Sequence, residues 1–190
     1  MQRADRFLEE SQAQPDLLGD AATEGDLPVG ELRGRLMREE DLLRFFAAGK
    51  AVLTVLGKFS GRRFTFKFSR PKEEQGKKRP IWAHLLSGPD NESSYEFSGT
   101  FWEIDGQGRG GTLPGQLYTY NHSAKSRLRH DAESVKALQW MARNMGSATH
   151  KLMRQAEFWH EGRCGRCARR LTVPSSVAAG FGPECAGRLH

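Results

Sequence analysis

The sequence predicts an α+β fold: a small antiparallel sheet of about five strands with two flanking helices and a C-terminal zinc knuckle. Apolar segments of strand length follow one another between residues 50 and 120, and no helical segment separates them as a parallel crossover would require. Apolar residues recur at helical spacing just before and just after that region. All three cysteines lie within residues 164–185.

The first predicted helix covers residues 39–48, whose sequence is EEDLLRFFAA. Acidic residues occupy its first turn, where the helix dipole favours negative charge, and Gly49 follows its last turn, as at many helix ends. We expect its buried face to consist of the apolar side chains Leu42, Leu43, Phe45 and Phe46.

Two pairs of strands and a fifth strand are predicted next. The first pair covers residues 51–56 and 62–68, which are rich in β-branched and aromatic residues and joined by a short turn. The second pair covers residues 81–86 and 95–102, with a Gly-Pro-Asp-Asn turn between them. Residues 116–120 are expected to form the fifth strand.

The strand at residues 62–68 alternates between aromatic and polar side chains, as a strand with one buried face does. Its buried face is predicted to carry Phe64, Phe66 and Phe68. The opposite face is either an ordinary solvated surface or an extension of an anion-binding surface, and it carries Arg63, Thr65 and Lys67.

The second predicted helix follows Asp131, which is a candidate N-terminal cap, and ends at Gly146. Its apolar residues recur at helical spacing and are Val135, Leu138, Met141, Ala142 and Met145.

Charge and composition divide the chain into three predicted parts. Residues 1–37 are expected to be a disordered acidic tail, residues 38–148 the antiparallel α+β domain, and residues 149–190 the zinc-binding module. Residues 1–32 carry two basic and eight acidic side chains, a net charge of −6, whereas the whole chain is +6, so residues 33–190 carry +12. A basic body favours an anionic partner, most commonly nucleic acid, and the acidic tail is a candidate competitor for the same surface.

The composition also bears on the compartment. No apolar segment reaches the roughly 18 residues needed to cross a bilayer, and the charged residues 1–10 lack the apolar core of a signal peptide. An odd number of clustered cysteines favours metal binding in a reducing compartment over a disulfide framework. We therefore expect a cytoplasmic protein without a membrane partner.

The clustered cysteines predict a metal site. Cys164 and Cys167 form a C-x2-C pair, and the intervening Gly165 permits a tight turn whose backbone N–H groups can bond the thiolates. Cys185 follows a glycine-rich approach to a short helix, whose positive end is expected to stabilise its thiolate. Tetrahedral zinc requires a fourth ligand, and the candidates are His160, which we favour, and His190. Four protein ligands would make the zinc structural, because no position remains for a catalytic water.

Basic residues surround the predicted site and recur in a second segment. The zinc-binding module carries Arg163, Arg166, Arg169 and Arg170. The segment before the second helix is either a solvated connector or a phosphate clamp, in which Tyr118 and Tyr120 are available for base stacking, and its cations are Lys125, Arg127 and Arg129.

Three blocks in the C-terminal part carry a resemblance to a known family. They are HEGRCGRC at residues 160–167, RLTVPSS at residues 170–176 and GFGPECA at residues 180–186. The chain resembles a family of uncharacterised, mostly phage-encoded proteins with a C-x2-C, L-T-x-P-x-S and G-x-G-P-x-C pattern. The resemblance implies a zinc-type module of phage origin, acting in a bacterial host cell, and it implies no established activity.

Taken together, the sequence favours a non-enzymatic, zinc-stabilised nucleic-acid-binding accessory protein of phage or prophage origin. The alternative is a phage protein-interaction module that binds and blocks a host defence or replication protein. A third hypothesis is an enzyme of unrecognised type that uses His84, His122 or His130.

Overall fold

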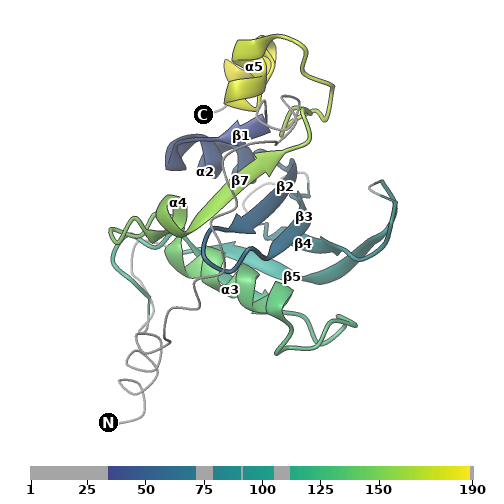
Figure 1. Ribbon diagram of the computed structural model, residues 1–190, viewed down its shortest axis with the longest axis vertical. Coiled ribbons are helices and arrows are strands. Elements are labelled where there is room, and N and C mark those ends of the chain that lie inside the picture. Colours follow the sequence, from purple (N-terminus) through teal and green to yellow (C-terminus); the bar gives the residue numbers. More distant parts are fainter. Residues whose placement is uncertain (1–33, 72–78, 91, 105–111, 189–190) are drawn as a thin grey trace.

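A single antiparallel sheet of seven strands organises the chain, in the order β1-β7-β2-β3-β4-β5-β6 (Figure 1). The computed structural model describes residues 34–71, 79–90, 92–104 and 112–188. Its strands are β1 (Arg35–Leu36), β2 (Lys50–Gly57), β3 (Arg63–Ser69), β4 (Ile81–Leu86), β5 (Tyr95–Glu103), β6 (Tyr118–His122) and β7 (Ala156–His160).

Two longer helices flank the sheet, and three short ones accompany β7 and the C-terminal segment. The helices are α2 (Glu39–Ala47), α3 (Glu133–Asn144), α4 (Lys151–Gln155), α5 (Pro174–Ala179) and α6 (Pro183–Ala186). In Figure 1, α5 lies beyond the β1 end of the sheet, α4 leads directly into β7, and α3 lies toward the other end of the sheet, where it contacts β6. The predicted α+β class and both predicted helices are confirmed.

The core lies on one face of the sheet. On β3, Phe66 and Phe68 are fully buried, whereas Arg63 and Lys67 are exposed, so the alternation read from the sequence is confirmed. Phe46 of α2 brings the helical layer onto this face: its ring lies 4.7 Å from that of Phe68 and 5.1 Å from that of Phe101. Helix α3 adds Val135, Leu138 and Met141, which are also fully buried.

The expected number of strands, about five, is wrong, because the sheet has two more. β7 pairs with β2 on one side and with β1 on the other. Alternate residues of β7 are buried, namely Ala156, Phe158 and His160, so this segment completes the core as well as leading into the first cysteine. A five-residue strand far from the others in sequence gains its pairing only through the tertiary fold.

The N-terminal residues differ in part from their predicted state. β1 falls within the segment expected to be a disordered tail, and it is paired along Arg35 and Leu36. The remainder of that segment, residues 1–33, lies outside the described residues. In the described part of the chain, no helix combines the length and apolar character needed to span a membrane.

Asp131 does not cap α3, contrary to the prediction. Ala132 occupies the N-cap position, and no side chain caps the helix there. The Asp131 carboxylate instead accepts two hydrogen bonds from Arg129, at 3.0 and 2.8 Å. The Asp131 carboxylate is therefore bound to the Arg129 guanidinium and not to the backbone N–H groups at the start of α3.

Replacing Phe46 by Ala is expected to lower the free energy of unfolding by about 3–5 kcal/mol, because it empties the contact between α2 and the sheet. Chemical denaturation followed by circular dichroism measures this loss. The matched control is Phe59→Ala in the β2–β3 turn, where the side chain is 86% exposed and the expected change is within about 0.5 kcal/mol. Equal effects at the two positions would contradict the one-sided core.

Candidate metal centre

The three cysteines meet at one point. The sulfurs of Cys164, Cys167 and Cys185 all lie within 4.8 Å of one another, close enough to bind a metal ion. Cys164 and Cys167 come from the turn that follows β7, and Cys185 comes from α6. Among the described residues, no further His, Cys, Asp or Glu joins this group at the same reach.

A tight hairpin presents the first two sulfurs. Its arms form a bridge between Arg163 and Arg170, and the Cys164 N–H donates to the Arg169 carbonyl at 2.8 Å. The Ala168 N–H donates back to the Cys164 carbonyl at 2.8 Å, with Ala168 in the left-handed region at φ 64°. These bonds turn the chain within four residues, so a C-x2-C spacing brings both side chains to one side.

The hairpin is fastened to the body of the protein through Gly165. Its carbonyl accepts the Lys50 N–H of β2 at 2.8 Å, and its N–H donates to the Gly180 carbonyl at 3.1 Å. Both glycines lie against the Phe45 ring, where an added Cβ would come within 2.9 Å at Gly165 and 2.5 Å at Gly180. Gly165 is therefore needed for close approach to α2. The two glycines are visible in the sequence, but nothing in the sequence indicates that both pack against the Phe45 ring.

The electrostatics of the centre favour ionisation of one cysteine. Burial opposes ionisation of Cys164, but backbone N–H groups of Cys167, Gly182 and Arg166 outweigh it and lower the pKa of this thiol to about 7. For Cys164 this agrees with the expectation that backbone N–H groups stabilise the thiolates. For Cys185, burial and the hydrogen bonds with the neighbouring sulfurs raise the pKa to about 11. Cys185 lies in the short helix α6, as expected, and the expected stabilisation of its thiolate by the helix end stays a prediction.

The donor set fits a soft divalent cation. Metal–sulfur bonds of about 2.3 Å at tetrahedral angles place sulfurs about 3.8 Å apart, so a spread of up to 4.8 Å needs only a small contraction. A bound cation would also hold the Cys185 thiolate, whose pKa is raised without it. The residues that would hold the ion are Cys164, Cys167 and Cys185.

His160, the favoured fourth ligand, is not brought into the group of sulfurs. It lies on β7, buried beside the Phe45 ring at a centroid distance of 5.1 Å. Its Nε2–H donates to the Val177 carbonyl at 2.8 Å, and its Nδ1 accepts the Gly162 N–H at 3.1 Å. Both ring nitrogens are thus engaged, so the imidazole ties β7 to α5 and has no lone pair free for a metal. His190 lies outside the described residues.

The four arginines predicted to bind nucleic acid surround the centre on its hairpin. Arg163, Arg169 and Arg170 are exposed and Arg166 is half-buried. Arg163 forms an ion pair with Glu92 at 3.7 Å, across to the loop between β4 and β5. Among the described residues, the other three arginines form no ion pair.

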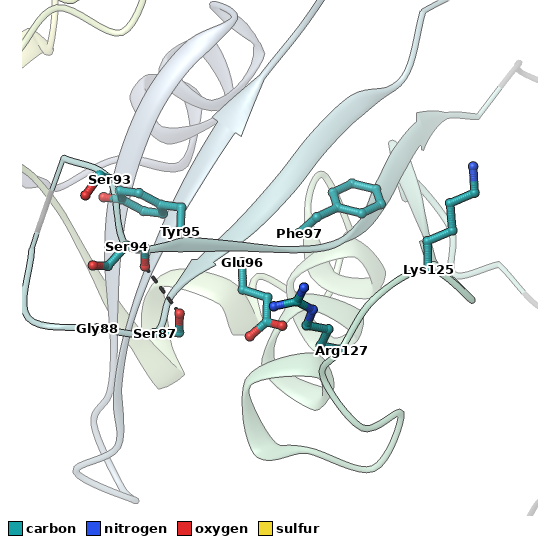
Figure 2. Close-up of a pocket in the computed structure, with 9 residues that line it drawn as sticks. All are labelled: Ser87, Gly88, Ser93, Ser94, Tyr95, Glu96, Phe97, Lys125 and Arg127. Atoms are coloured by element: carbon teal, nitrogen blue, oxygen red, sulfur yellow. Dashed lines mark hydrogen bonds between the residues drawn. The ribbon is translucent and has the colours of Figure 1, made fainter.

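The second predicted cationic segment lies against a different part of the sheet. Lys125 and Arg127 line a pocket of about 450 Å³ with the β4–β5 loop and the start of β5. Figure 2 shows Tyr95 and Phe97 on one side of β5, with Glu96 and Arg127 on the other. Arg129, the third cation of the segment, is bound to Asp131 and does not line the pocket.

The three histidines proposed for an enzyme lie in two places, with His122 beside His130 and His84 on β4. His122 and His130 stack edge to face at 5.5 Å, and His122 Nε2 is bonded to the Leu128 carbonyl at 3.1 Å. His84 lies on β4 against the Phe97 ring at 5.3 Å, and burial lowers its pKa. The buried Nδ1 of His84 has no hydrogen-bond partner among the described residues.

A family model matches the metal centre. The family of unknown function DUF6011 matches residues 154–190, which contain β7, the cysteine hairpin, α5 and α6. No curated protein and no solved structure matches the chain. The match therefore covers the C-terminal segment, together with the strand that anchors it in the sheet.

Replacing Cys164 by Ser is expected to abolish stoichiometric metal binding, because it removes one of the three sulfurs, a thiol whose pKa is lowered to about 7. Elemental analysis of the purified protein measures metal per chain.

The affinity for the metal should also decrease as the pH is lowered. The Cys185 thiol, with a pKa of about 11, is protonated near neutrality, so binding releases its proton and affinity drops at least about tenfold per pH unit. Below pH 7 Cys164 also binds a proton and the drop steepens. A Zn²⁺ competition titration from pH 8 to pH 6 that showed constant affinity would contradict this donor set.

Replacing His160 by Gln distinguishes a structural histidine from a ligand. Loss of its bonds to Val177 and Gly162 is expected to lower the free energy of unfolding by about 1–3 kcal/mol while one metal ion per chain is retained. Denaturant titration and elemental analysis of the same preparation give both quantities. Loss of the metal from a folded variant would instead identify His160 as the fourth ligand.

Proposed function

We propose that this chain is a non-enzymatic accessory protein of a phage or prophage, whose zinc-stabilised C-terminal module binds nucleic acid. One observation carries the proposal: the hairpin that holds two of the cysteines also presents Arg166, Arg169 and Arg170, which form no ion pair among the described residues. They belong to a body, residues 33–190, with a net charge of +12. Unpaired guanidinium groups on a strongly basic body suit a polyanionic partner.

Zinc is the metal that best suits this role. Three cysteine sulfurs in a turn-and-helix arrangement are typical ligands of structural zinc, and the ion has no redox chemistry of its own. Its contribution would be to hold the hairpin, since the Cys164 N–H and the Arg169 carbonyl form one of the hairpin bonds. The arginines would thus be positioned by the same turn that positions the ligands.

Binding by these arginines would be directed mainly at phosphates. Guanidinium groups bind phosphate oxygens through paired N–H donors, and such contacts fix position without reading the bases. The expected binding is therefore weakly sequence-specific and steeply dependent on salt. Lys125 and Arg127 are candidates for a second point of phosphate contact, because both line the pocket beside β5.

Phage origin is supported by the three sequence blocks of the C-terminal module, which resemble a mostly phage-encoded family. The alternative function, a phage module that binds and blocks a host protein, uses the same module as a rigid support. The two differ in their response to salt and to nucleic acid, so one titration separates them.

Replacing Arg166, Arg169 and Arg170 together by Gln is expected to weaken binding to labelled DNA and RNA at low salt. Each phosphate contact removed should reduce the slope of log affinity against log salt by about 0.7–0.9. Fluorescence anisotropy across a salt series measures both quantities. The matched control is Arg129→Gln, because Asp131 already neutralises that guanidinium, and its affinity should stay within about twofold of the unmodified protein.

Absence of binding to any nucleic acid at low salt would remove this function. Specific capture of a host protein by the same preparation would then favour the alternative. Binding that persists unchanged in the triple Gln variant would place the contact surface elsewhere on the chain.

A further inference from the structure

On β4 and β5, the face of the sheet opposite the core carries large aromatic side chains as well as polar ones. Trp82 of β4 is 45% exposed and Trp102 of β5 is 39% exposed, each next to a residue of the buried face. Trp82 pairs with Thr100, whose hydroxyl oxygen accepts a hydrogen bond from the Trp102 indole N–H at 3.1 Å. Successive side chains on one face of neighbouring strands lie about 5–8 Å apart, so the two indoles are neighbours.

Phe97 extends this group toward the pocket. Its ring meets that of Trp82 at 6.5 Å, edge to face, and it lines the pocket together with Lys125 and Arg127. A β-bulge between Ala83 and His84 shifts the register here and turns Phe97 onto the same face as Trp82. We name the group formed by Trp82, Phe97 and Trp102 the aromatic platform.

Cationic side chains lie at the pocket beside the platform. At the pocket end, Lys125 and Arg127 are exposed and form no ion pair among the described residues. Figure 2 shows the Lys125 side chain extending beside Phe97. Tyr95 lines the same pocket, and burial, followed by the carboxylates of Glu161 and Asp90, raises the pKa of its hydroxyl to about 12.

We propose that the aromatic platform binds single-stranded nucleic acid by stacking bases on Trp82, Phe97 and Trp102, with Lys125 holding a phosphate beside Phe97. The inference rests on the proposed nucleic-acid-binding function and names the form of nucleic acid that the protein selects. Exposed indole faces with the unpaired Lys125 beside Phe97 match a chain of alternating bases and phosphates. A duplex already stacks its bases internally and presents no free base face to the indoles, so it would gain only the phosphate contacts.

The proposed stacking also gives a role to Trp82 and Trp102, which are exposed and not needed for the core. Each projects away from the buried face, so neither contributes to the packing against α2 and α3. Large exposed apolar side chains gathered on one surface commonly mark a binding site. A protein partner is the competing occupant, but it would not need the unpaired cations at the pocket.

Binding of the full-length, metal-loaded chain to a labelled oligothymidylate and to a duplex of the same length tests the inference. Trp82→Ala and Trp102→Ala are each expected to lower affinity for the single strand by roughly fivefold or more, with duplex affinity nearly unchanged. Trp82→Phe keeps an aromatic face and should restore most of the loss. The matched control is Phe59→Ala, which removes an exposed aromatic ring away from the platform and should leave both affinities unchanged. Thermal unfolding checks that each variant is folded.

A second readout reports stacking directly. Oligothymidylate should quench tryptophan fluorescence in the unmodified protein and in Phe59→Ala, and quench it less in Trp82→Ala and Trp102→Ala.

Each other outcome overturns the inference in a recognisable way. Unchanged single-strand affinity in the folded tryptophan variants, with binding still lost in the triple Arg variant, would leave the proposed function standing and remove the platform. Equal losses for single strand and duplex would remove base stacking. No nucleic-acid binding by the unmodified chain would end both proposals. Self-association or host-protein capture that depends on Trp82 and Trp102 would assign the platform to a protein partner.

Discussion

The contact between the Phe45 ring and the backbone of Gly165 and Gly180 is the constraint on which the rest of the structure depends. One side of this phenylalanine belongs to α2 and the core of the sheet, and the other side receives the cysteine hairpin and the end of α5. A segment of about thirty residues cannot bury enough apolar surface to fold alone, so it needs either a metal or a neighbour. Here it has the neighbour, and its three sulfurs lie close enough together to bind a metal ion.

The same region explains why the metal centre and the sheet form a continuous structure. β7 completes the core through Phe158 and leads directly into the hairpin, while the Lys50 N–H of β2 binds the Gly165 carbonyl. His160 adds a side-chain link from β7 to the Val177 carbonyl of α5. A cation held at the three sulfurs would therefore stabilise a hairpin that is already positioned by the protein, and the arginines on that hairpin would share its rigidity.

The two candidate binding surfaces would contact different parts of a nucleic acid, the phosphates and the bases. The hairpin offers guanidinium groups, whereas the open face of the sheet offers aromatic rings with cations at one end. The Arg163–Glu92 ion pair connects the hairpin to the β4–β5 loop, and Ser93, the next residue of that loop, lines the pocket beside Phe97. A single strand bound at both surfaces would pass along this loop, so the proposed phosphate contacts and the proposed stacking belong to one path.

Local patterns in the sequence determined the class of fold, five of the strands, both longer helices and the clustering of the cysteines. Alternation in RRFTFKF and the apolar spacing around Leu138 depend on the geometry of a single strand or helix, so no distant residue is needed to recognise them. Only the tertiary structure showed that Ala156–His160 pairs with β2 as a strand. It also showed that the Asp131 carboxylate binds Arg129 and does not cap α3, and that both ring nitrogens of His160 bond to the backbone. It alone also placed Trp82, Phe97 and Trp102 on one face, through a bulge that sequence alternation does not reveal. These outcomes depend on which distant groups compete for the same hydrogen bond or sheet edge, and that competition is settled when the chain is packed.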